Sequence, residues 1–170
     1  MSLSIAVGIA TRGRPAILAE PLAELARQTR PPEAILVCHV TDDDVGDLPA
    51  RLPDIRFLKA EAGLPRQRNA ILDAAAEDVV LFLDDDFLPA PAYLAVLERV
   101  LEARPDCVVA TGTVIADGAK GPGLSVQEGR AILAADTPPA DPLAAVPHFN
   151  GYGCNMAFRM APVRAHGVRV

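Results

Sequence analysis

A run of five apolar residues, 79–83 (VVLFL), ends directly at three consecutive aspartates, Asp84, Asp85 and Asp86. An apolar run of this length with β-branched and aromatic side chains predicts a strand buried on both faces, as in a parallel sheet. The aspartates would then lie at the carboxyl end of that strand, which is the edge where open α/β sheets bind their ligands. The pattern therefore predicts a fold class and the position of a site within it.

The three carboxylates constrain the chemistry of this predicted site. Like charges so close together raise one another's pKa values unless a cation neutralises them. Oxygen ligands suit Mg²⁺ or Mn²⁺, and such ions commonly hold the phosphates of a substrate. The alternative is a solvated acidic turn in which an aspartate caps the next helix, with Pro89 and Pro91 near its start.

Apolar runs typical of strands alternate with stretches of helical periodicity along the chain. The predicted strands are residues 4–10, 34–40, 55–59, 79–83 and 107–115, and the predicted helices are residues 15–28, 66–76 and 92–103. Residues 117–147 are rich in Gly and Pro, with a weak helical stretch at 126–135, a loop predicted to be mobile at 136–147, and a further short strand expected at 156–159. The alternation predicts an α/β fold with a mostly parallel sheet flanked by helices, and 170 residues suit a single domain.

Charge and composition exclude several classes of protein. The 22 acidic and 16 basic residues leave a net charge of −6, which disfavours a nucleic-acid binder, and the absence of Trp disfavours a stacking platform for single strands. Three cysteines argue against a disulfide framework and suit a reducing cytosol, and Cys38 and Cys107 are expected to be buried in strands. No leader peptide or transmembrane segment is expected, so we predict a cytoplasmic protein, with peripheral membrane association left open.

Five segments, in order along the chain, resemble glycosyltransferase family 2, whose members are inverting glycosyltransferases. The segments are residues 8–15 (GIATRGRP), 28–35 (QTRPPEAI), 63–70 (GLPRQRNA), 81–94 (LFLDDDFLPAPAYL) and 153–159 (GCNMAFR). The fourth contains the family's Asp-x-Asp signature, which is weak alone but specific as one of five ordered matches. The resemblance implies the GT-A fold of nucleotide-diphospho-sugar transferases, with a Rossmann-like, mostly parallel sheet.

The resemblance also implies a reaction, in which a sugar passes from a nucleotide diphosphate sugar, by default a UDP-sugar, to an acceptor hydroxyl. The charge that develops on the leaving diphosphate needs a cation, and the resemblance implies that Asp86 holds this ion, Mn²⁺ or Mg²⁺. It implies that Asp84 accepts a hydrogen bond from the nucleotide ribose. Asp85 is grouped with these donor-binding residues but is expected to point to the other side. The acceptor, a saccharide or a lipid-linked sugar, stays undefined.

Three further residues belong to the implied site. Thr11 is expected to border the base pocket, or instead to cap the helix that begins near Pro15. Arg68 is expected to contact the nucleotide or to pair with the acidic cluster, with a surface or structural ion pair as an equal alternative. Asn155 is expected in an acceptor-side loop, residues 149–158, where its side chain meets substrate or hydrogen-bonds loop backbone. His39 is expected to be a core histidine rather than a ligand.

The chain departs from the family pattern in two places. After the second strand the family carries an acid that binds the nucleobase, whereas here residues 38–41 (CHVT) stand there and the acids follow at 42–44. Uridine, thymidine and guanosine therefore stay open. Inverting transfer also needs a general base, which in the family is an Asp or Glu well after the acceptor segment, and residues 160–170 contain neither. We expect no catalytic base within these residues, and a chain that ends before the acceptor and catalytic-base region.

Two other classes of function stay open. A non-catalytic fragment or pseudoenzyme would hold a nucleotide sugar without transferring it, which agrees with the missing base. A phosphoryl-transfer enzyme would also use Asp84 and Asp86 after a buried strand. Haloacid-dehalogenase phosphatases, which show such a motif, carry Thr or Val two residues after the second Asp, where this chain has Leu88.

Overall fold

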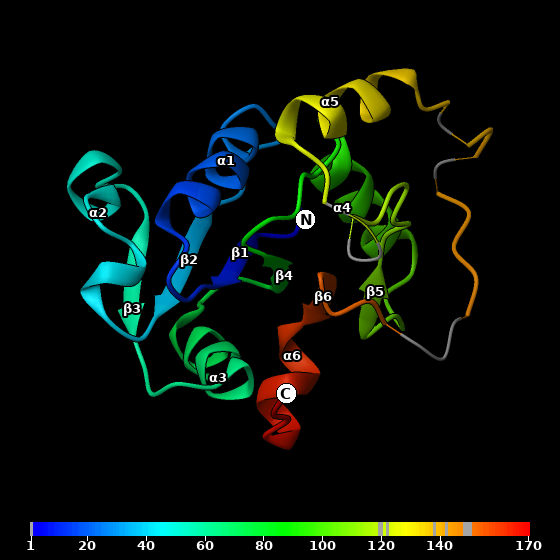
Figure 1. Cartoon of the computed structure of the whole chain (residues 1–170). Coiled ribbons are helices and arrows are strands. Elements are labelled where there is room, and N and C mark those ends of the chain that lie inside the picture. The colour runs from blue at the N-terminus through cyan, green and yellow to red at the C-terminus, as the bar shows by residue number, and fades with distance from the viewer. Residues whose placement is uncertain (1, 119–120, 122, 138, 142, 148–150) are drawn as a thin grey trace.

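The computed structural model describes residues 2–118, 121, 123–137, 139–141, 143–147 and 151–170, which form one mixed sheet with helices on both faces (Figure 1). The strands are β1 (Ile5–Ala10), β2 (Ala34–His39), β3 (Arg56–Lys59), β4 (Val79–Asp84), β5 (Val109–Thr111) and β6 (Asn155–Arg159). The α-helices are α1 (Pro15–Leu25), α2 (Leu48–Arg51), α3 (Leu64–Ala74), α4 (Tyr93–Ala103), α5 (Val126–Ala135) and α6 (Met160–His166), with a 3-10 turn at Asp42–Asp44. The mostly parallel α/β sheet expected from the sequence is confirmed.

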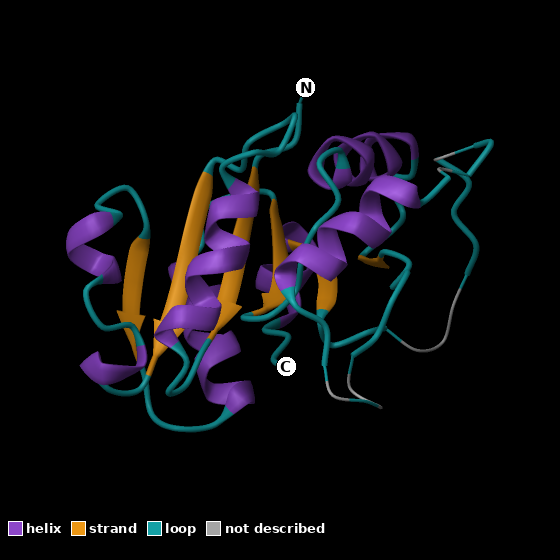
Figure 2. Cartoon of the chain, turned by 45° about the horizontal axis from the view of Figure 1, so that its top comes forward, coloured by secondary structure: helices purple, strands orange, loops and turns teal. Residues whose placement is uncertain are grey.

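The strand order β3-β2-β1-β4-β6-β5 brings the ends of distant segments to one edge (Figure 2). The strands β1, β2, β3 and β4 run parallel, and Ala10 at the end of β1 lies opposite both Cys38 and Asp84. The strand β6 runs antiparallel to β4 and to β5, and its register places Asn155 opposite Leu83. The carboxyl ends of β1, β2, β4 and β5 and the start of β6 therefore share one edge, where Asp84 lies.

Two hydrophobic cores form because alternate residues of each buried strand face opposite sides of the sheet. In β1, Ile5, Val7 and Ile9 belong to the core that packs under α1 and α4, whereas Ala6 belongs to the core under α3 and α6. The strand β4 follows the same alternation, as its unbroken apolar run predicts. Figure 1 shows these helices on the two sides of the sheet, so the strands that carry the aspartates are buried on both faces.

The helix α3 approaches β1 closely because Gly8 has no side chain. A Cβ atom added at Gly8 would lie 2.6 Å from Cγ2 of Ile71, a fully buried residue of α3, and 3.2 Å from Cδ1 of Phe82. Glycine therefore allows the helix that carries Arg68 to lie directly against the strand that leads into Thr11.

Three expectations from the sequence differ from the structure. The strand expected at 107–115 contains only β5, an edge strand paired on one side, so Val109 stays 46% exposed and Cys107, expected to be buried, is only half-buried. The acidic loop after β2 folds into the 3-10 turn and α2. The helix α6 follows β6 directly, where no helix was expected, because Met160 and Val163 are buried one turn apart.

Candidate active site

The three aspartates at the end of β4 occupy different environments. Asp84 is the last residue of β4, and its backbone N–H donates to the carbonyl of Cys154 at 3.3 Å. The side chain of Asp85 is only 2% exposed, whereas those of Asp84 and Asp86 are 39% and 58% exposed. A buried carboxylate thus lies between two accessible ones.

Asp85 is held by two residues of the loop that follows β1. The hydroxyl of Thr11 donates to Oδ2 of Asp85 at 2.7 Å, and the guanidinium of Arg14 pairs with Oδ1. Burial raises the pKa of Asp85 above its ordinary value, and the nearby Asp86 and Asp84 raise it further, while Thr11 and Arg14 lower it. The alternative that Thr11 caps α1 is wrong, because the N-cap of α1 is Arg14.

Arg14 also reaches the exposed third aspartate. Its Nη1 lies 3.3 Å from Oδ2 of Asp86, so one guanidinium spans two successive carboxylates. The sequence reasoning missed Arg14. The signal that identifies it is the pairing of β1 with β4, since a residue just after β1 then lies beside the residues just after β4.

Arg68 pairs with the acidic cluster, which is one of the alternatives that the sequence left open. Its Nη2 lies 3.2 Å from Oδ1 of Asp84 and donates to the carbonyl of Gly153 at 2.6 Å. Its guanidinium carbon also lies 5.6 Å from the centroid of the Phe82 ring, a cation–π contact. The side chain is only 11% exposed, and it ties α3 to β4 and to the loop before β6.

Asn155 is fully buried at the start of β6. Its Oδ1 accepts hydrogen bonds from the hydroxyl of Thr111 at 2.6 Å and from the backbone N–H of Gly112 at 3.0 Å. Because the Gly112 N–H needs an acceptor, these contacts fix which end of the amide is the oxygen. The Nδ2 group of Asn155 then has no hydrogen-bond partner among the described residues. Asn155 is thus the first residue of β6 and not part of the loop expected at 149–158, because its side chain is held by the hydroxyl of Thr111 and the backbone of Gly112 just after β5.

Asp44 is the acid after β2 that the structure fully buries, and the sequence reasoning did not single it out. Its Oδ2 accepts the backbone N–H groups of Val40 and Thr41 at 2.9 and 2.8 Å, and its Oδ1 accepts that of Gly13 at 2.8 Å. Burial alone would raise the pKa of Asp44, but the hydrogen bonds from Thr41, Val40 and Gly13 outweigh it and lower the pKa. The capping-box spacing from Thr41 to Asp44 is the signal that identifies it.

Two buried polar residues connect the strand ends behind the aspartates. Gln67 donates from Nε2 to the carbonyls of Thr11 and Cys38, both at 2.9 Å, and so joins the ends of β1 and β2 to α3. His39 is buried as expected, and its Nδ1 lies 2.8 Å from the carbonyl of Thr41, so that this nitrogen carries the proton. These bonds fix the loop from which Thr11 and Arg14 project and its position against α3, the helix that carries Arg68.

The donor groups at this edge suit a divalent cation that a substrate helps to hold. Asp86 offers an exposed carboxylate, and Asp84 a second one that is part-exposed. Among the described residues, no group of three His, Cys, Asp or Glu side chains converges on a common point. Mg²⁺ is commonly bound by one or two carboxylates together with substrate phosphates, so the residues present fit such an ion.

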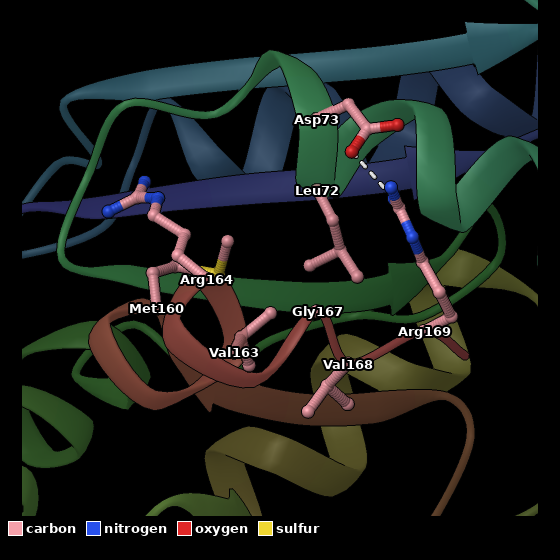
Figure 3. Close-up of a pocket in the computed structure, with 8 residues that line it drawn as sticks. All are labelled: Leu72, Asp73, Met160, Val163, Arg164, Gly167, Val168 and Arg169. Atoms are coloured by element: carbon pink, nitrogen blue, oxygen red, sulfur yellow. Dashed lines mark hydrogen bonds and ion pairs between the residues drawn. The ribbon is translucent and has the colours of Figure 1, made fainter.

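A separate hollow of about 240 Å³ lies between α3 and α6 (Figure 3). Leu72 and Val163 line it, and Arg169 closes one side through an ion pair with Asp73 at 2.6 Å. The backbone of Met160, which also lines it, bonds to the carbonyl of Asp78, just before β4 begins. The hollow therefore lies at the opposite end of β4 from Asp84, and we do not include it in the candidate site.

Comparison with solved structures supports the fold. The chain is similar to a mannosyltransferase, PcManGT from Pyrobaculum calidifontis in complex with GDP-Man and Mn²⁺, with 17% identity and a TM-score of 0.64 over 98% of this chain and 47% of that one. It is also similar to TarS 1–349 from S. aureus, with 18% identity and a TM-score of 0.67 over 98% and 50% of the two chains, and to the same protein in complex with UDP-GlcNAc, with 17% identity and a TM-score of 0.65 over 98% and 48%. The chain thus spans about half the length of these structures.

Two further findings bear on the class of the protein. No curated protein sequence matches the chain. Within the part of the chain that the structure describes, none of the helices has the length and apolar character needed to cross a membrane. The model of one family, glycosyl transferase family 2, matches residues 6–166, which contain β1, β4 with its three aspartates, and β6. The chain therefore belongs to glycosyl transferase family 2.

Proposed function

We propose that this domain binds the nucleotide diphosphate sugar of a metal-dependent, inverting glycosyltransferase at the carboxyl edge of the sheet. The observation that carries the proposal is the grouping of three aspartates with Thr11 and Arg68 at that edge, with one aspartate buried and two accessible. Membership of glycosyl transferase family 2 supports the class of reaction. The complexes of similar structures with GDP-Man and UDP-GlcNAc support a nucleotide sugar as the ligand.

In this proposal each accessible aspartate has a separate task. Asp86, the most exposed of the three, holds Mn²⁺ or Mg²⁺, which would offset the charge on the leaving diphosphate. Asp84 accepts a hydrogen bond from the nucleotide ribose, beside Arg68. Asp85 is buried, and it supports the site by holding Thr11 and Arg14 in place. Thr11 and Arg68 border the nucleotide, and the loop before Asn155 faces the acceptor.

The identity of the nucleotide base is less directly indicated by the residues of this chain. In the family an acid after the second strand binds the base, and in this chain Asp44 is the buried acid of that region. Its carboxylate accepts three backbone N–H groups, so it is occupied by the protein. We propose that Asp44 shapes the base pocket rather than bonding to the base, and we keep UDP as the first nucleotide to test, followed by GDP and dTDP.

The reaction proposed is a single displacement at the anomeric carbon of the sugar. The acceptor oxygen forms a bond to that carbon as the bond to the diphosphate breaks, so the configuration inverts. The acceptor proton passes to a general base. We assign this base to no residue of the chain. The acceptor is proposed only as a saccharide or lipid-linked hydroxyl, and a cytoplasmic location stays a prediction.

Thermal unfolding with a panel of UDP, GDP, dTDP and their sugars, with and without Mn²⁺, tests this proposal. A nucleotide at about a hundred times its dissociation constant should stabilise the folded chain by about 2.7 kcal/mol, and only when Mn²⁺ is present. The substitution Asp86→Ala should abolish the Mn²⁺-dependent shift, while Asp43→Ala, which removes an exposed acid from the loop after β2, should keep it. A shift of equal size in the Asp86→Ala chain would contradict the metal assignment.

Binding without transfer is the second candidate function, because Asp84 and Asp85 are each paired with an arginine and Asp86 is assigned to the metal, which leaves no aspartate of this cluster free to act as a general base. Turnover assays on this chain with the nucleotide sugar that gives the largest shift separate the two. Release of free nucleotide or transfer to an added saccharide supports a transferase. A metal-dependent shift with neither reaction supports a binding domain.

A further inference from the structure

The charges at the carboxyl edge are already matched to a large extent by the chain itself. Two arginines face three aspartates there: Arg68 pairs with Asp84, and Arg14 spans Asp85 and Asp86. Three negative and two positive charges leave one net negative charge in the cluster. A divalent cation that binds here therefore meets carboxylates that already have a cationic partner.

The two arginines differ in how firmly they are held. Arg68 is 11% exposed and contacts Asp84, the carbonyl of Gly153 and the ring of Phe82. Arg14 is 47% exposed, and among the described residues its guanidinium pairs with the two carboxylates. Moving Arg68 would break three contacts and leave a buried aromatic ring uncovered. Moving one end of the Arg14 guanidinium requires only a rotation of a half-exposed side chain. Arg14 is therefore the arginine that a metal ion can displace from its carboxylate.

The two contacts of Arg14 also differ from one another. Its Nη2 reaches the buried Asp85, which would be left as an uncompensated buried charge without it. Its Nη1 lies 3.3 Å from Asp86, whose side chain is 58% exposed, and an exposed contact of that length contributes little to stability. The contact with Asp86 can be lost while the contact with Asp85 stays in place.

We propose that Arg14 is the internal counter-ion of Asp86 and that it gives up this carboxylate, while keeping Asp85, when the divalent cation binds. This inference rests on the proposed function, because it takes Asp86 as the metal ligand. A guanidinium and a divalent cation on the same carboxylate repel each other, so metal binding is an exchange of one cation for another rather than an addition. Arg14 is then a positioning residue that keeps Asp85 and Asp86 in place before the metal arrives and sets how tightly the metal is held.

The affinity for Mn²⁺ alone, measured from the electron paramagnetic resonance signal of the free ion, tests the exchange. The variant Arg14→Gln removes the competing cation, and Arg12→Gln is the matched control, since it removes the same charge from an exposed arginine two residues earlier. We expect Arg14→Gln to bind Mn²⁺ about two- to fivefold more tightly than Arg12→Gln, which corresponds to the strength of one exposed ion pair.

A second variant separates the charge of Arg14 from its geometry. Arg14→Lys keeps the positive charge, but a single ammonium cannot span two carboxylates as a guanidinium does. We expect the lysine to stay with the buried Asp85 and leave Asp86 free, so that this chain also binds Mn²⁺ more tightly than the unsubstituted one. Thermal unfolding in EDTA shows whether each variant is folded. If Arg14→Gln is not folded, the lysine variant decides the question.

The outcomes distinguish this inference from the proposed function. Equal or weaker Mn²⁺ binding in Arg14→Gln than in Arg12→Gln overturns the exchange and leaves the proposed function standing, since the unsubstituted chain still binds the metal. Equal or weaker binding in Arg14→Lys than in the unsubstituted chain overturns it in the same way. Absence of Mn²⁺ binding from every chain tested, with UDP, GDP or dTDP present as well as with the metal alone, overturns both the exchange and the metal-dependent function.

Discussion

Replacing Asp44 with asparagine should destabilise the domain without removing a ligand contact. The carboxylate accepts three backbone N–H groups, two on Oδ2 from Val40 and Thr41 and one on Oδ1 from Gly13. An asparagine with its oxygen toward Val40 and Thr41 turns its NH₂ group against the N–H of Gly13. With the oxygen toward Gly13 it loses two bonds instead of one. Either orientation leaves at least one buried donor without an acceptor.

The magnitude follows from these lost bonds. Hydrogen bonds to charged groups contribute about 1.5–3 kcal/mol each, and Asp44 is only 5% exposed. We therefore expect Asp44→Asn to lower the free energy of unfolding by about 2–3 kcal/mol. For a domain of this size that corresponds to a fall in Tm of about 4–10 °C. The loss should appear in urea unfolding as a lower midpoint with an unchanged slope.

The pH dependence provides an independent check. Because the folded protein lowers the pKa of Asp44 below its ordinary value of 3.8, the carboxylate stabilises the fold at pH values above the unfolded pKa. That stability is lost as the pH falls through the folded pKa. The gap between the unsubstituted and Asp44→Asn chains should therefore be full at neutral pH and close in acid. The exposed Asp43→Asn is the control. A loss below about 0.5 kcal/mol for Asp44→Asn, the size of an ordinary surface substitution, would refute the reasoning.

Two further substitutions test the packing around the site. Asn155→Ala should lower the free energy of unfolding by about 1–3 kcal/mol, because the half-buried N–H of Gly112 loses its acceptor; a chemical melt measures this, and no change would mean that water replaces the amide. Gly8→Ala should lower it by about 1–3 kcal/mol through the clash with Ile71. In a double-mutant cycle with Ile71→Ala the two losses should sum to more than the loss of the pair, and strict additivity would contradict the close approach of α3.

The central strands and their direction follow from the sequence because their cause is local. An apolar run buried on both faces and followed by acids predicts both β4 and the ligand edge at its end, and the structure has them at these positions. The direction of β6 does not follow from its residues. It depends on the chain re-entering the sheet at the edge where β4 and β5 end, which no local pattern in Asn155–Arg159 records.

The site could be predicted in part for the same reason. The aspartates follow their strand directly in sequence, so their placement at the edge could be inferred. The partners of Asp85 could not, because Thr11 and Arg14 lie more than seventy residues away and meet it only through the pairing of β1 with β4. The role of Asp44 was missed because three neighbouring acids look alike in the sequence, while only the third is enclosed by backbone donors.

The antiparallel strand β6 has a consequence for how such a domain can diversify. Since β5 ends and β6 begins at the edge that carries Asp84, residues 112–154 leave the sheet and rejoin it on the same side as the proposed donor site. Such a segment can be lengthened, shortened or exchanged while β4, β6 and β5 keep their register. Under the proposed function, a chimera that exchanges this segment for the equivalent segment of another family member should change the acceptor preference and keep the metal-dependent nucleotide binding.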